Sequence, residues 1–203
     1  MIQKDWTGNK HSVFVTHGAT SHSNLIRPEG DFYATDPHTT EIFLKKLKKD
    51  GVNLPNEITE PCCGEGHISE VLIKHGYKVD SYDLYDRGYG ITGVDFLKSS
   101  LKAKCFFTNP PFKNSLDFVK KALENTKKDG GVIMLLRLQF LEGKERNKFF
   151  KEHPPKYIYV NSTRQNCARN ADFATYEKAT AMCFTWFIWK KGFKGEPTIR
   201  WVD

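Results

Sequence analysis

The sequence alternates short apolar runs with amphipathic helical segments, and this alternation constrains the fold more than any other feature. The run at residues 130–138, GGVIMLLRL, is apolar throughout, which is typical of a strand that helices cover on both faces of a parallel sheet. Further strands are predicted at residues 57–61, 77–84, 104–109, 156–160 and 181–191, and helices at residues 36–51, 66–75, 114–128 and 144–152. The pattern predicts an α/β fold with a doubly wound, mostly parallel sheet and an antiparallel edge strand.

The length of the chain, 203 residues, fits one globular domain. Residues 1–30 are rich in Gly, Ser, His and Asn, so an irregular arm is predicted there, with one short strand at SVFV, residues 12–15. No apolar run approaches the roughly 20 residues of a membrane span. The first residues also lack the pattern of a signal peptide, so a cytoplasmic protein with no membrane partner is expected.

Neither the cysteines nor the histidines form a recognisable metal-binding pattern. The five cysteines contain no CxxC pair. His11, His17 and His22 have no acidic or thiol partners at the spacing that metal ligands require. We therefore predict no metal site and no disulfide framework.

Positive charge is concentrated in the second half of the chain. The net charge is +7, but residues 1–112 carry 13 Lys+Arg against 14 Asp+Glu, whereas residues 113–203 carry 18 against 10. A basic half suits a polyanionic partner such as nucleic acid, although a charge of this size also serves solubility alone.

A glycine-rich turn, EPCCGEGHIS at residues 60–69, follows the first predicted strand of the domain. Gly64 and Gly66 permit a tight turn and a close approach of the backbone to a ligand. The third glycine of a dinucleotide-binding GxGxxG turn is missing, and Glu60 at the strand end suits a cationic amino group better than a pyrophosphate. Asp83, at the end of the next strand, is placed to accept hydrogen bonds from ribose hydroxyls.

Asp95 and Phe96 extend this set in the segment GVDFL. Asp95 is predicted to accept a hydrogen bond from an adenine amino group, and Phe96 to pack on the ring. Each aspartate alone is equally consistent with a turn or a helix cap. The ordered set, however, implies a ligand with an amine, a ribose and an adenine but no phosphates.

A second group of residues, TNPPF at 108–112, follows a later predicted strand. Consecutive prolines fix the backbone and prevent either a helix or a sheet from continuing. The side-chain carbonyl of Asn109 and the main-chain carbonyl of Pro110 can then converge on a planar NH2 group, which has two hydrogens to donate. Phe112 offers a face for base stacking. A surface turn is the ordinary alternative, because Asn-Pro often begins one.

The chemistry of an adenine amino group explains why two acceptors are needed. Its nitrogen lone pair is delocalised into the ring, so the nitrogen is a poor nucleophile. Carbonyl oxygens that hold its hydrogens favour a pyramidal nitrogen and offset the positive charge that develops as a methyl group arrives. A bound donor supplies the methyl group, and the protein supplies the alignment.

Taken together, these motifs resemble the amino-methyltransferase branch of the S-adenosylmethionine-dependent family. NPPF is similar to the catalytic tetrapeptide of adenine-specific DNA methyltransferases, and DFYATD at residues 31–36 is similar to the segment that closes over the methionine end of the cofactor. The motif order resembles the gamma arrangement, and the tail TWFIWKKGFKGEPTIRW resembles small phage-encoded enzymes. The resemblance implies a seven-stranded Rossmann-like sheet, S-adenosylmethionine as cofactor, DNA as partner and methylation of the adenine amino group.

The motifs and the resemblance together give a set of expected site residues. The expected cofactor-binding residues are Tyr33, Thr35, Glu60, Pro61, Cys62, Gly64, Gly66, His67, Asp83, Asp95, Phe96 and Asn109. The expected catalytic residues are Asn109, Pro110, Pro111 and Phe112, and the expected substrate-binding residues are Phe112, Lys113, Arg164 and Arg169.

Family members of the restriction type usually add a separate target-recognition domain, whereas about 90 residues follow NPPF here, so residues 31–203 are expected to form a single methyltransferase domain without one. Arg164 and Arg169, in the stretch STRQNCARNADFATYEK, are therefore predicted to contact phosphates or flanking bases; a solvated loop is the alternative. Similar tetrapeptides also occur in RNA methyltransferases and in enzymes that act on protein glutamine. A non-catalytic cofactor-binding module and a nicotinamide-binding oxidoreductase are the remaining alternatives. The intact NPPF disfavours the module, and Glu60 with the missing glycine disfavours the oxidoreductase.

Overall fold

The computed structural model describes residues 29–165, 167–173 and 182–203, and within them the predicted α/β fold is confirmed. The helices are α2 (Pro37–Lys49), α3 (His67–Lys74), α4 (Ser115–Asn125) and α5 (Lys144–Glu152), with short 3-10 turns η1 (Glu29–Asp31), η2 (Phe112–Asn114) and η3 (Leu138–Leu141). The strands are β1 (Tyr33–Thr35), β2 (Glu57–Glu60), β3 (Lys78–Ser81), β4 (Ala103–Thr108), β5 (Thr126–Arg137), β6 (Tyr157–Asn161), β7 (Cys167–Arg169), β8 (Phe184–Lys190) and β9 (Thr198–Val202). The strand predicted at SVFV lies outside the described residues.

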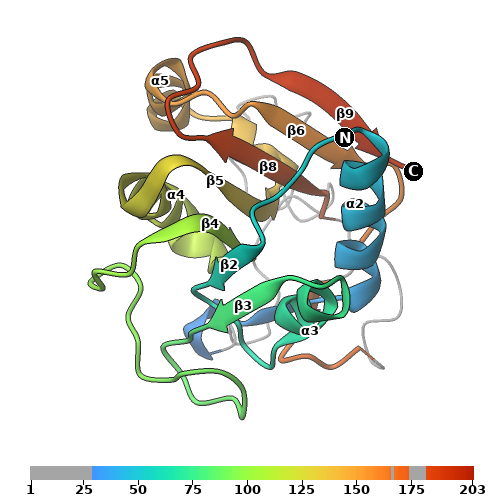
Figure 1. Cartoon of the computed structure of the whole chain (residues 1–203), viewed down its shortest axis with the longest axis vertical. Helices are drawn as coiled ribbons and strands as arrows, with labels where there is room; N and C mark the ends of the chain where they lie inside the picture. Colours follow the sequence, from blue (N-terminus) through green and yellow to red (C-terminus); the bar gives the residue numbers. More distant parts are fainter. Residues whose placement is uncertain (1–28, 166, 174–181) are drawn as a thin grey trace, which may run out of the picture.

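Seven strands form one twisted sheet in the order β3-β2-β4-β5-β8-β6-β9 (Figure 1). All pairs are parallel except those that β8 makes with β5 and β6, so the sheet is mostly parallel, as predicted. The antiparallel strand, however, lies inside the sheet rather than at its edge, and the outermost strand β9 runs parallel to β6. The sequence of β8, FTWFIWK, fits this inner position, because its first six residues are all buried and their side chains alternate between the two covered faces of the sheet.

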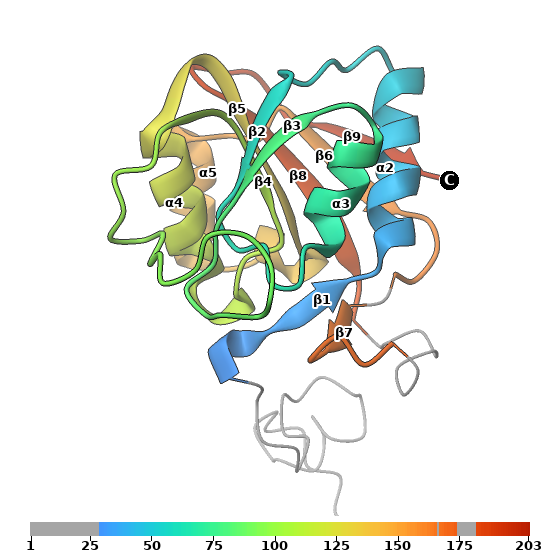
Figure 2. The same cartoon turned by 60° about the horizontal axis from the view of Figure 1, so that its bottom comes forward.

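The helices cover the two faces of this sheet and enclose two apolar clusters. Figures 1 and 2 show α2 and α3 on one face, and α4 and α5 on the other. On the first face, Phe43 of α2 stacks on Trp186 of β8 with ring centres 4.5 Å apart. On the second face, Phe118 and Val119 of α4 pack under β4 and β5. Both faces of the sheet are therefore shielded from solvent, as the doubly wound pattern requires. No helix among the described residues is long and apolar enough to span a membrane.

Several segments differ from the sequence-based prediction, which included neither β1 nor β9. The helix predicted to reach residue 128 ends at Asn125, because Thr126 already pairs with Ala103 as the first residue of β5 while its hydroxyl donates to the Ala122 carbonyl at 2.6 Å. The stretch predicted as a loop after residue 161 contains β7. This strand pairs antiparallel with β1 in a separate two-stranded sheet beside the main one (Figure 2).

Candidate functional site

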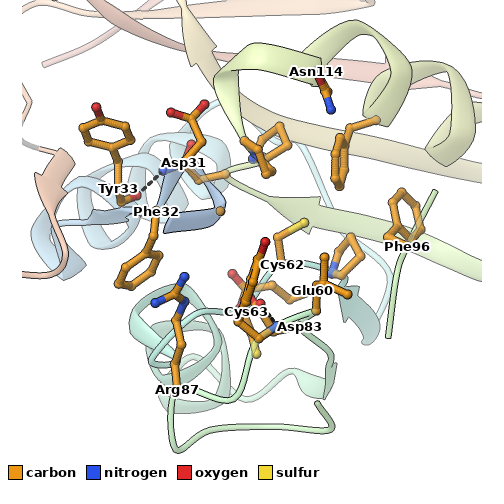
Figure 3. Close-up of a pocket in the computed structure, with 18 of the residues that line it drawn as sticks. Asp31, Phe32, Tyr33, Glu60, Cys62, Cys63, Asp83, Arg87, Phe96 and Asn114 are labelled. Carbon is orange, nitrogen blue, oxygen red and sulfur yellow. Dashed lines mark hydrogen bonds between the residues drawn. The ribbon is translucent and has the colours of Figure 1, made fainter. Parts of the chain in front are cut away.

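A pocket of about 420 Å³ opens at the carboxyl ends of β2, β3 and β4. This edge is where parallel α/β sheets bind ligands, because loops there diverge to either face. Figure 3 shows Glu60, Cys62, Cys63 and Asp83 gathered on one side of the pocket, with Tyr33 and Asp31 on another and Phe96 at the far end. Segments that are far apart in the sequence therefore meet in one cavity.

Most of the predicted site residues line this pocket. They are Tyr33, Thr35, Glu60, Pro61, Cys62, His67, Asp83, Asp95, Phe96, Asn109, Pro110, Pro111, Phe112 and Lys113. Gly64 and Gly66 shape the adjoining turn without lining the cavity, and Arg164 is exposed outside it. Of Arg169 the structure describes the backbone, in β7, but not the side chain. The structure thus brings the two predicted motifs together and leaves the predicted nucleic-acid residues beyond the pocket lining.

The glycine-rich turn is closely packed, and only glycine fits it. Gly64 has φ of +54°, and a Cβ atom added there would lie 2.4 Å from the ring of Phe32. Gly66, which precedes α3, has φ of +86°, and its Cβ would lie 2.6 Å from the ring of Tyr89. Any side chain here would be strained in conformation and would clash with a neighbouring aromatic ring.

Glu60 is a buried acid at the end of β2. Burial raises the pKa of Glu60 to about 8, while a hydrogen bond from the Ser69 hydroxyl opposes this shift. The Ser69 hydroxyl lies 2.6 Å from the hydroxyl of Ser81 in turn, so three polar side chains form a connected group, of which Glu60 lines the pocket. An apolar surrounding disfavours the carboxylate, and a cation bound beside it would restore the charged form.

Asp83 holds the glycine-rich turn to the segment after β3. Its two carboxylate oxygens accept hydrogen bonds from the amide nitrogens of Gly64, at 2.8 Å, and Tyr85, at 2.9 Å. A carboxylate has about four acceptor positions, so these bonds still leave capacity for ribose hydroxyls. Asp83 therefore has a structural role that the sequence-based prediction did not include.

Asp95 and Phe96 lie at the opposite end of the pocket from Tyr33. Asp95 accepts a hydrogen bond from the Leu97 amide at 3.1 Å and pairs with Lys98 at 3.0 Å, and the bond from Lys98 lowers the pKa of Asp95. The carboxylate is thus ionised and suited to accept from an amino group. Phe96 is buried against Phe106 and Phe118, so its ring belongs chiefly to the apolar cluster and meets the pocket at one side only.

Asn109 has a fixed orientation. Its side-chain nitrogen donates to the Tyr33 carbonyl at 2.9 Å and to the Thr35 hydroxyl at 3.0 Å. A main-chain carbonyl can only accept, so the nitrogen and not the oxygen of the amide must face β1. The amide oxygen Oδ1 is buried and has no hydrogen-bond partner within the described ranges of the chain. A buried acceptor without a donor is costly in free energy, which points to a ligand that supplies one.

Phe112 follows the two prolines and is packed on several sides. Its ring centre lies 5.7 Å from that of Tyr33 and 5.4 Å from that of Phe184, and the guanidinium of Arg137 lies 4.8 Å above it. These neighbours limit the ring surface that is left for a nucleobase. Lys113 is anchored through its backbone, since its amide nitrogen donates to Asp31 Oδ2 at 3.0 Å.

Two pocket residues that sequence reasoning missed are Phe32 and Arg87. The Arg87 guanidinium lies 4.1 Å from the ring centre of Phe32 and 5.3 Å from that of Tyr85 (Figure 3). Such cation–π contacts between separate loops have no periodic signal in the sequence. The only available hint was the grouping of aromatic residues around the predicted motifs.

The remaining predicted residues act through shape rather than reactivity. Burial raises the pKa of the Cys62 thiol well above its ordinary range, so it is not a nucleophile at neutral pH. His67 begins α3 and makes an edge-on contact with Phe173, at 5.2 Å between ring centres. Among the described residues, no group of three or more His, Cys, Asp or Glu side chains could hold a metal ion.

The sheet order and the pocket at its carboxyl edge define a Rossmann-like α/β fold of the methyltransferase type. A putative class I S-adenosylmethionine-dependent methyltransferase from Listeria monocytogenes is similar, with a TM-score of 0.59 and 13% identity over 94% of this chain and 70% of that one. A putative RNA methyltransferase from Pyrococcus horikoshii gives 0.57 and 14% over 79% of this chain and 87% of the other.

A methyltransferase subunit of a type I restriction-modification system from Streptococcus thermophilus also shares the fold. It gives a TM-score of 0.59 and 12% identity over 81% of this chain and 46% of the subunit. No protein-family model matches the chain, and no curated protein matches it with significance. At such low identities, the likeness establishes the fold and leaves the activity to be argued from the site.

Proposed function

We propose that this protein transfers a methyl group from S-adenosylmethionine to the exocyclic amino group of adenine in DNA. The observation that carries the proposal is the orientation of Asn109, whose nitrogen is bound by β1 and whose buried oxygen lacks a donor. A planar NH2 group is the donor that best fits an acceptor of this kind.

The pocket fits the proposed cofactor on several grounds. Glu60 is a buried acid that a cationic amino group would stabilise in its charged form. Asp83 and Asp95 stand at successive positions along the same edge and suit the ribose and the adenine. The turn at Gly64 has no space for a side chain, because the ring of Phe32, which lines the pocket, packs directly against it. The similar structures from Listeria monocytogenes and Streptococcus thermophilus are described as methyltransferases, which supports the same chemistry.

The residues of the NPPF segment would act by positioning and electrostatics. The bound cofactor supplies an electrophilic methyl group on a sulfonium. Asn109 Oδ1 and the Pro110 carbonyl accept hydrogen bonds from the target amine, which makes its nitrogen more pyramidal and more nucleophilic. As the amine nitrogen took up that methyl group from the sulfonium, the two oxygens would stabilise the positive charge that develops on nitrogen until a proton left. Loss of one such acceptor typically costs about 10²–10³-fold in rate.

Nucleic acid is the substrate class that the charge distribution favours. Residues 113–203 carry 18 Lys+Arg against 10 Asp+Glu, and Arg164 is exposed outside the pocket. A base in a duplex must leave the stack to reach Asn109, so the target adenine would be flipped into the cavity. A similar solved structure is described as a restriction-modification methyltransferase subunit, which supports DNA. Another is described as a putative RNA methyltransferase, which makes RNA the rival substrate to be tested.

Incubation with cofactor labelled in its methyl group tests the proposal. Duplex DNA, single-stranded DNA, RNA and a glutamine-containing peptide are offered in parallel, and the products are digested and separated. We expect label in N6-methyladenine from DNA. Label found only in RNA or only in the peptide would show that this molecule, and not DNA, is the substrate. No transfer to any of the four substrates would contradict the proposed activity.

A further inference from the structure

The orientation of Asn109 depends on a strand that is not part of the main sheet. Both hydrogens of its amide nitrogen are directed to β1, one to the Tyr33 carbonyl and one to the Thr35 hydroxyl. Thr35 is buried, so water does not replace its hydroxyl in this bond. Any shift of β1 would therefore rotate or release the amide.

Strand β1 is itself held by β7. The two strands pair antiparallel, with Tyr33 opposite Arg169 and Thr35 opposite Cys167, and they form a sheet of their own (Figure 2). Between these pairs, Ala34 and Ala168 face each other and both are buried. Cys167 Sγ also lies 4.0 Å from the Asn109 nitrogen. Among the described strands, β7 is the sheet partner of β1.

The segment around β7 contacts a helix on each side, α2 before the strand and α3 after it. Before the strand, the buried side-chain oxygen of Gln165 accepts a hydrogen bond from the Thr39 hydroxyl of α2 at 2.9 Å. After it, Phe173 contacts His67 at the start of α3, and His67 lines the pocket. Gln165 thus contacts α2, β7 pairs with β1, and Phe173 contacts the start of α3.

From these contacts we infer that β7 is a positioning element for the Asn109 amide, an inference that rests on the proposed function. β7 fixes β1, and Thr35 on β1 is the positioning residue that keeps the amide nitrogen turned away and the oxygen available. Of the two arginines that are predicted to contact nucleic acid, Arg169 lies in β7 and Arg164 directly precedes Gln165. Contact with the substrate and orientation of the catalytic amide therefore share one structural element.

Three threonine variants test the inference. Thr35→Val removes the hydroxyl and keeps the shape, and Thr35→Ser restores the hydroxyl. Thr40→Val is the matched control, because Thr40 is equally buried and its hydroxyl has no hydrogen-bond partner among the described residues. The readouts are the hydrogen exchange of the Asn109 side-chain NH2, followed by NMR, and the kcat and the DNA KM.

We expect Thr35→Val to lower kcat by about 10- to 100-fold, since small misplacements of a reacting group have effects of this size. The DNA KM should stay within about twofold, because a bond that only orients the Asn109 amide does not contribute to the ground-state binding of DNA. The NH2 protons of Asn109 should exchange faster in Thr35→Val than in the wild type. In Thr35→Ser and Thr40→Val they should exchange at the wild-type rate. An unchanged exchange rate or an unchanged kcat in Thr35→Val would overturn the inference.

A fourth variant, Gln165→Ala, tests the role of β7 without touching β1 or Asn109. It removes the bond to Thr39, and we expect faster exchange of the Asn109 NH2 protons. Exchange as slow as in the wild type would overturn the role of β7. If the wild type transfers no methyl group at all, the proposed function fails, yet the exchange measurements still decide whether β7 and Thr35 position the amide.

Discussion

The guanidinium of Arg87 lies 4.1 Å from the ring centre of Phe32, so the loop after β3 meets the segment before β1 where both line the pocket. The same two segments also touch at Gly30, where an added Cβ would lie 2.5 Å from the ring of Tyr85. This contact closes the pocket on the side of the glycine-rich turn, because Phe32 also packs against Gly64. We therefore expect it to strengthen the binding of a cofactor.

Arg87→Met tests this expectation, since it keeps the length of the side chain and removes the cation. A cation–π contact is worth about 0.5–1 kcal/mol at exposed sites, so the Kd for a non-reactive cofactor analogue should rise about two- to fivefold by calorimetry. Arg146→Met is the control, because Arg146 lies 5.5 Å from the ring centre of Phe140 and does not line the pocket. Equal affinities for the two variants would contradict the role of Arg87.

Asp83→Asn should weaken both the fold and cofactor binding. The carboxylate accepts from the amides of Gly64 and Tyr85, and a carboxamide in its place turns one acceptor into a donor. We expect the free energy of unfolding in urea to fall by about 1–3 kcal/mol, as for other buried donors left unpaired. Asp86→Asn is the control, since Asp86 caps an exposed turn at Gly88. A variant as stable as this control would show that Asp83 does not hold the turn.

Glu60 should make stability depend on pH. The pKa of Glu60 is about 8 in the folded protein, against an ordinary value of 4.5. Between pH 4.5 and pH 8 the folded state therefore holds a proton on Glu60 that the unfolded state has lost. Stability should therefore decrease as pH rises from about 5 to 8, with a slope that approaches about 1.4 kcal/mol per pH unit. Urea unfolding across this range measures the slope, and Glu60→Gln should remove it. A flat profile in the wild type would show that Glu60 is already ionised.

The cofactor should change the protonation of the same residue. A cationic amino group beside Glu60 favours the carboxylate, so binding at pH 7 should release close to one proton. Calorimetry in buffers of different ionisation enthalpy measures this release. It should disappear in Glu60→Gln, whereas the same release in both proteins would assign the proton to another group.

Charge reversal at Arg164 and Arg169 tests the nucleic-acid interface. Each phosphate contact contributes about −0.9 to the slope of log K against log salt for duplex DNA, so the double variant to Glu should bind more weakly and with a shallower slope. Lys148→Glu with Lys151→Glu, on the exposed side of α5, controls for net charge. If both double variants lose affinity equally, a general charge effect and not this segment accounts for binding.

Hydrophobic periodicity in the sequence was sufficient to predict the elements whose own residues form one apolar face. The helix α5 was predicted with its observed bounds, because an amphipathic stripe specifies a helix without reference to distant residues. β1 and β7 were not predicted, because each is a strand of three residues and their partner lies more than 130 positions away in the sequence. A short window of sequence contains no signal of a pairing between residues so far apart.

The site residues also divide into those that the sequence could predict and those that it could not. Asn109, Glu60 and Asp83 were found because they follow strands whose carboxyl ends must meet at one edge. The bonds that orient them were not predictable: Thr35 was expected only as a cofactor-binding residue, and its hydrogen bond to Asn109 has no signal in the sequence. Contacts between loops, such as that of Phe32 with Arg87, arise only once the chain has folded.

Asn109→Ala gives the most direct test of the account, because it removes the acceptor and leaves the glycine-rich turn, Glu60 and Asp83 in place. Methyl transfer to DNA and the cofactor Kd are measured on the same preparation, with urea unfolding as the check of folding. We predict that transfer falls by at least about 100-fold, as for loss of one such oxygen or donor, while the Kd stays within about twofold. A folded variant that methylates adenine at the wild-type rate would contradict the account.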